Sequence, residues 1–66
     1  MKNEKIFNGF IKQEFASEVM DLIPNGAHIN LNSIHDTMHL SLVVEFENEE
    51  DARTFKKEVI PYKANF

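Results

Sequence analysis

Three histidines are the residues of this chain with the clearest potential for metal chemistry. His35 and His39 are four residues apart and Asp36 follows the first of them, which are ligand types and a spacing found in zinc sites. That spacing brings side chains to one face on a helix, whereas here it crosses a predicted turn and a strand start. His28 is expected too far along the neighbouring strand to complete the set. We therefore expect surface histidines and no cofactor, with a His35/His39 metal-binding module as an alternative.

Motifs for nucleophilic catalysis or phosphate binding are missing from the sequence. There is no Cys, the serines lie outside any nucleophile-elbow pattern, and the two Gly form no phosphate-binding loop. A chain of 66 residues also has little depth from which water could be excluded. We therefore predict that the protein is not an enzyme.

Five carboxylates lie within seven residues, at Glu45, Glu47, Glu49, Glu50 and Asp51, and are called the acidic ridge below. A helix start explains part of this run, because acidic side chains in a first turn interact favourably with the helix dipole. A ridge of carboxylates could also complement a basic patch on a partner. An acidic mimic of nucleic acid that blocks a basic channel is therefore a second alternative.

Two helices are predicted, one before and one after a pair of strands along the chain. Apolar residues recur every three or four positions over residues 9–23, where Ile11, Phe15 and Val19 share one stripe. The second helix is predicted over residues 49–60, with Asn48 as its N-cap. A narrow apolar stripe on this second helix is formed by Ala52, Phe55 and Val59.

Between the helices the apolar period changes to two, which predicts strands over residues 27–32 and 38–46. The residues expected to be buried are odd-numbered on the first strand and even-numbered on the second. Same-face pairing in an antiparallel hairpin then requires a loop with an even number of residues. The preferred register places Leu42 opposite Ile29, with both side chains in the core.

The order of elements predicts one α+β domain over residues 1–66, in which an antiparallel β-hairpin packs against two helices (αββα). Short strands are also conceivable at residues 5–7 and 62–66. With both of them the chain becomes a minimal βαββαβ sandwich that resembles the ferredoxin-like superfold. Both arrangements remain open at this point.

The charge balance limits the partners that the chain can bind. Seven Lys and Arg against eleven Asp and Glu give a net charge of −4, which makes direct nucleic-acid binding unlikely because such binding depends on clustered cations. No apolar run approaches the ~20 residues of a membrane span, and the N-terminus has no signal-peptide core. We therefore expect a cytoplasmic protein without membrane contact.

Large apolar side chains are more numerous than one small core is expected to cover. The chain has six Phe, one Tyr and three Met, and such a surplus often marks an interface. We predict a non-enzymatic protein–protein interaction module, a regulator or inhibitor that occludes a partner protein or forms a homodimer. Its composition is similar to that of small accessory proteins of bacteria and phages. The residues predicted to bind the partner are Phe10, Ala16, Met20, Val43, Glu47, Glu49 and Glu50.

Overall fold

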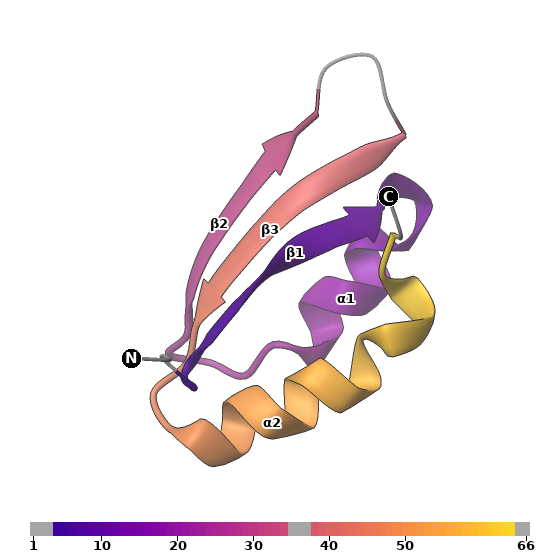
Figure 1. Ribbon diagram of the computed structural model, residues 1–66. Coiled ribbons are helices and arrows are strands. Elements are labelled where there is room, and N and C mark those ends of the chain that lie inside the picture. Colours follow the sequence, from indigo (N-terminus) through magenta and orange to yellow (C-terminus); the bar gives the residue numbers. More distant parts are fainter. Residues whose placement is uncertain (1–3, 35–37, 65–66) are drawn as a thin grey trace.

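Three antiparallel strands carry two helices on one side of the sheet in the computed structural model, which describes residues 4–34 and 38–64 (Figure 1). The α+β class that the sequence predicts is confirmed. The sheet has three strands rather than two, because a strand precedes the first helix. The elements are β1 (Ile6–Lys12), the 3-10 helix η1 (Gln13–Phe15), α1 (Ala16–Leu22), β2 (His28–Ser33), β3 (His39–Glu45), α2 (Glu49–Glu58) and the 3-10 helix η2 (Ile60–Tyr62).

The middle strand of the sheet is β3, and the strand order is β1-β3-β2. Both neighbours pair with β3 in the antiparallel sense. Consequently β1 and β2 run parallel to each other with β3 between them, and η1 and α1 connect them. The sheet therefore has two edge strands, β1 and β2.

The predicted helix over residues 9–23 is wrong in its first part, which forms β1. Phe7 and Ile11 face the core from β1, and Gly9 lies between them. A spacing of four residues fits both a strand and a helix, so Ile11 and Phe15 share a predicted stripe although only Ile11 lies in a strand. Glycine disfavours a helix interior, and a Cβ atom at Gly9 would come within 3.0 Å of the Phe7 ring.

The hairpin of β2 and β3 has the predicted parity but a register displaced by two residues. Leu42 lies opposite Leu31 instead of Ile29, and Ile29 lies opposite Val44. The Ile34 backbone N–H donates to the His39 carbonyl (3.3 Å), which continues the same displaced register beyond Ser33. Residues 35–37, between the two strands, lie outside the described residues.

The prediction that Asn48 caps the start of the second helix is confirmed. The Asp51 backbone N–H donates to the Asn48 side-chain oxygen at 2.8 Å, as expected for an N-cap. The stripe of Ala52, Phe55 and Val59 is buried. Helix α2 ends at Glu58, two residues before the predicted end.

The core lies between the sheet and the helices, and aromatic rings form one end of it. Phe55 of α2 packs edge-on against Phe7 of β1 at a centroid distance of 5.1 Å, and its ring is tilted against that of Phe46 at 5.3 Å. The complete buried cluster consists of Phe7, Ile11, Val19, Leu40, Leu42, Val44, Phe46, Ala52, Phe55 and Val59.

The C-terminal segment contacts the outer edge of β1. Lys63 forms an isolated antiparallel bridge with Ile11, and the Ala64 N–H donates to the Phe10 carbonyl at 2.9 Å. The strand considered over residues 62–66 does not include Tyr62, which belongs to η2, and residues 65–66 lie outside the described part. At the other end, residues 6–7 of the strand considered over residues 5–7 belong to the longer β1, and Lys5 precedes it.

Candidate functional site

Strand β2 is the most exposed element of the sheet. All six of its residues are exposed, including two large apolar side chains, Ile29 (47% exposed) and Leu31 (38%). Both are predicted from the sequence to be buried, and the structure corrects that prediction. The residues that they oppose on β3, Val44 and Leu42, are fully buried.

Ile29 and Leu31 nevertheless point to the helix side of the sheet. Residues directly opposite each other in an antiparallel pair project from the same face, and Val44 and Leu42 belong to the core between the sheet and the helices. The period of two that predicted a core face was therefore correct about direction. The helices leave this strand of the sheet uncovered, so the two side chains meet solvent.

The backbone N–H and C=O groups of the same residues point away from β3, toward the unpaired edge of the sheet. Antiparallel ladders alternate, so that every second residue directs its N–H and C=O toward the neighbouring strand. The bond from Ile34 to His39 fixes this alternation, and the even-numbered residues of β2 face β3. Ile29, Leu31 and Ser33 therefore direct their N–H and C=O groups outward. Within residues 4–34 and 38–64, no strand pairs with this edge.

The strand also lies in a long uncharged segment. No Asp, Glu, Lys or Arg occurs from Leu22 to His35, which is the longest such run in the sequence. The outward backbone groups and side chains of Ile29, Leu31 and Ser33 are called the open edge below. The open edge combines unpaired backbone donors and acceptors with exposed apolar surface, a combination that allows another strand to add to the sheet.

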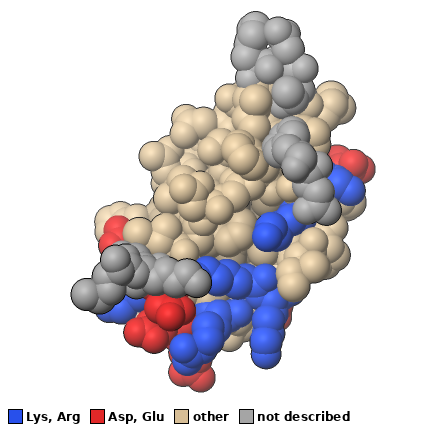
Figure 2. Space-filling model, in the orientation of Figure 1, with Lys and Arg blue, Asp and Glu red and all other residues tan. Residues whose placement is uncertain are grey.

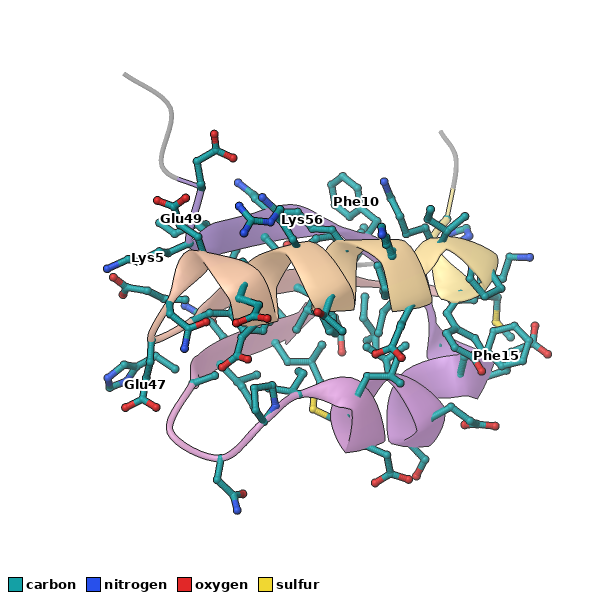
Figure 3. All side chains as sticks on the ribbon, turned by 90° about the horizontal axis from the view of Figure 1, so that it is seen from below. Lys5, Phe10, Phe15, Glu47, Glu49 and Lys56 are labelled. Carbon is teal, nitrogen blue, oxygen red and sulfur yellow. The ribbon has the colours of Figure 1, made fainter. Side chains whose placement is uncertain are left out.

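A second uncovered surface is the face of the sheet opposite the helices. Phe10 is exposed (39%) and Val43 is half-buried there. They are diagonal neighbours, because Phe10 lies opposite Ser41 and Val43 lies opposite Asn8. Figure 3 shows the Phe10 ring beyond β1, on the side away from α1. This surface is called the open face.

The residues predicted to bind a partner do not form one surface. Phe10 and Val43 lie together on the open face, whereas Ala16 and Met20 belong to the helix layer on the other side of the sheet. Both α1 residues are half-buried and pack against the core. The predicted helix over residues 9–23 contained both Ile11 and Met20, whereas Ile11 lies in β1 and Met20 lies in α1.

The remaining predicted residues lie at the start of α2, where positive charges accompany the carboxylates. The Glu49 carboxylate lies 3.7 Å from the Arg53 guanidinium, and both side chains are largely exposed. Figure 3 places Glu47 and Glu49 at one end of the molecule together with Lys5, and Figure 2 shows both signs of charge at the α2 end. The acidic ridge, to which Glu50 also belongs, is therefore not a uniform negative patch.

Glu47 has a close neighbour outside the ridge. Gly26 has φ of +95°, a conformation that glycine adopts readily, and a Cβ atom there would come within 2.8 Å of the Glu47 Oε1 atom. The turn before β2 therefore approaches the segment before α2 closely.

The described residues offer little for metal chemistry. Within residues 4–34 and 38–64, no group of three or more His, Cys, Asp or Glu side chains could hold a metal ion. The alternative site at His35 and His39 falls partly outside this range, because His35 and Asp36 are not described. In the same part of the chain, neither α-helix has the length and apolar character needed to cross a bilayer.

Comparison of the chain with protein-family models, with curated proteins and with solved structures finds no match.

Sequence reasoning missed the open edge because it assigned Ile29 and Leu31 to the core. The signal that could have identified it is the absence of charge from Leu22 to His35. Edge strands that avoid association commonly carry Lys or Pro, and β2 has neither.

Proposed function

We propose that this chain is a small non-enzymatic interaction module that regulates or inhibits a partner protein by binding and occluding one of its surfaces, and that it binds through the open edge. The observation that carries this proposal is that β2 is exposed on both faces, with Ile29 and Leu31 uncovered beside outward backbone groups. Strand addition to such an edge obtains affinity from main-chain hydrogen bonds and specificity from alternate side chains.

The arrangement of the sheet is consistent with a ferredoxin-like fold whose last strand is reduced to one bridge, and we include this in the proposal. Three features support it. Strands β1 and β2 are parallel with β3 between them, a helix connects them, and Lys63 bridges to the outer side of β1. In this fold one sheet edge receives the C-terminal segment, and β2 forms the other edge.

The open edge is favoured over the open face as the binding surface because it combines two kinds of contact. On the open face the backbone groups of β3 are used within the sheet, so a partner there would contact side chains only. On the open edge a partner strand would bond to three residues of backbone and cover Ile29 and Leu31. These two side chains remain the largest apolar residues of β2.

Two adjacent substitutions in β2 distinguish these surfaces. Leu31→Lys places a charge on the helix side, within the open edge, while Asn32→Lys places the same charge on the open face. Both residues are exposed, so neither change is expected to unfold the chain. We expect Leu31→Lys to lose a protein that the unmodified chain captures from its native cell extract, and Asn32→Lys to retain it.

Circular dichroism of both variants is the folding control. Loss of capture by Asn32→Lys together with retention by Leu31→Lys would move the binding surface to the open face. Retention by both folded variants would also contradict the proposed role of the open edge.

A further inference from the structure

We infer that a second copy of this chain occupies the open edge, with the two β2 strands pairing antiparallel across a two-fold axis to form one six-stranded sheet. This inference rests on the proposed role of the open edge in binding. A second copy and a partner protein would use the same residues, so the paired form is the chain that has not bound its partner. Closed two-fold pairing is the commonest symmetry of soluble oligomers. Three properties of β2 favour a second copy as an occupant of this edge.

The first property is charge. The chain has a net charge of −4, so two copies that met through an acidic surface would repel each other. The open edge lies in the longest segment without Asp, Glu, Lys or Arg, from Leu22 to His35. Two copies can therefore approach through β2 without placing carboxylates opposite each other. A basic partner would gain no electrostatic attraction from these residues, whereas an identical uncharged strand needs none.

The second property is the absence of devices that keep edge strands apart. Natural edges are protected by charged side chains, proline, bulges or a covering segment. Residues His28–Ser33 contain no Pro, Lys, Arg, Asp or Glu, and they pair with β3 in continuous register. The opposite edge of the same sheet is contacted by Lys63 and Ala64. Only β2, among the described strands, is left open along its length.

The third property is self-complementarity. The outward backbone groups belong to Ile29, Leu31 and Ser33, and an antiparallel copy offers the same groups in reverse order. With Asn30 on the two-fold axis, Ile29 of each copy lies opposite Leu31 of the other. All four large apolar side chains of the two strands then form direct cross-strand pairs, which stabilise sheets. With Leu31 on the axis, Ile29 would instead oppose Ser33.

The same pairing also covers the exposed apolar surface. Opposed residues of antiparallel strands project from one face, so Ile29 and Leu31 of both copies lie together on the helix side of the joined sheet. Each copy thereby covers the side chains that its own helices leave exposed. Apolar area removed from water contributes ~25 cal/mol per Å².

The register predicts a specific cross-link. Asn30 of one copy faces Asn30 of the other copy across the axis. The two residues form a non-hydrogen-bonded pair with a Cα separation of ~4.5 Å. This separation lies within the range of a disulfide, and the chain contains no Cys of its own. We therefore expect Asn30→Cys to form a covalent dimer under mild oxidation.

Asn32→Cys is the matched control. In the proposed register, residue 32 of one copy lies opposite His28 of the other copy. The two Cys side chains would then be four residues apart along the strands, a distance of ~13 Å, and should not cross-link. Equal cross-linking of both variants would overturn the register, and absence of cross-linking in Asn30→Cys would overturn the strand pairing.

Sedimentation of the unmodified chain, Leu31→Lys and Asn32→Lys completes the test. We expect the unmodified chain and Asn32→Lys to approach twice the monomer mass as concentration rises through the micromolar range, and Leu31→Lys to remain monomeric with unchanged circular dichroism. A monomeric unmodified chain whose capture of another protein still depends on Leu31 would overturn this inference while supporting the proposed function. A dimer lost in Leu31→Lys, without capture of any protein, would support the inference and contradict the proposed regulatory role.

Discussion

The two edge strands of the sheet have the same central neighbour but different environments. Phe7 of β1 and Ile29 of β2 lie opposite the same residue, Val44, on its two sides. Phe7 is 5% exposed and Ile29 is 47% exposed. Both are large apolar residues on the helix side of the sheet, so neither residue type nor direction explains the difference.

The difference arises from the elements that cover each strand. Phe55 of α2 packs edge-on against Phe7, and Ala64 donates a hydrogen bond to the outer edge of β1. Figure 1 shows β2 at the opposite edge of the sheet from β1, the strand that the C-terminal segment contacts. The alternation of a strand therefore defines which of its faces is apolar, whereas the layer above the strand determines whether that face is buried.

The largest expected effect concerns this matched pair of side chains. Phe7→Ala removes a buried ring that contacts Phe55, and such truncations cost roughly 3–5 kcal/mol of unfolding free energy. Ile29→Ala, at a half-exposed site, should cost less than ~1 kcal/mol in the monomer, because little buried surface is lost. Urea unfolding at low protein concentration measures both values. Equal costs would show that β2 is covered as well as β1.

The central strand provides the next test. Leu42 is fully buried between Gly9 of β1 and Leu31 of β2, and we expect Leu42→Ala to cost roughly 2–5 kcal/mol. Its neighbour Ser41 projects from the open face, so Ser41→Ala should change stability by less than ~0.5 kcal/mol. Denaturant midpoints that ranked the two variants in the opposite order would contradict the assignment of faces.

A smaller effect than that of Leu42→Ala is expected where the chain covers the β1 edge. Ala64→Pro removes the N–H that donates to the Phe10 carbonyl, a loss of roughly 0.5–1.5 kcal/mol. Lys63 has φ of −70° and ψ of 144°, which a following proline permits. Ala64→Ser keeps the N–H and is the control in thermal unfolding. If both variants melted at the temperature of the unmodified chain, the bridge would contribute nothing to the β1 edge.

Local signals in the sequence predict the hairpin and second helix well. The Asn48 cap is a contact between near neighbours, and the buried stripe of α2 follows from periodicity alone. The parity of β2 and β3 is likewise a local property. The N-terminal strand was considered only over residues 5–7. The rest of it was assigned to a helix, because a spacing of four, from Ile11 to Phe15, fits a strand and a helix equally well.

The candidate site was predicted only in part, because it depends on which strands of the sheet the helix layer covers. Phe10 and Val43 do lie near each other, but on the face opposite the one that carries Met20. The assignment of Ile29 to the core required knowing which strand the helices cover, and no local pattern contains that information. The uncharged run around β2 was visible in the sequence, yet its meaning depends on β2 being an edge.

Residue-resolved amide hydrogen exchange of β2, measured at increasing protein concentration, tests the central claim most directly. At low concentration we expect Asn30 and Asn32, whose N–H groups face β3, to be protected, while Ile29, Leu31 and Ser33 exchange rapidly. As copies associate, Ile29 and Leu31 should become protected as well, because their outward N–H groups then bond to the second β2 strand. Rapid exchange of Ile29 and Leu31 at every concentration, in a sample that sedimentation shows to be dimeric, would contradict pairing through the open edge.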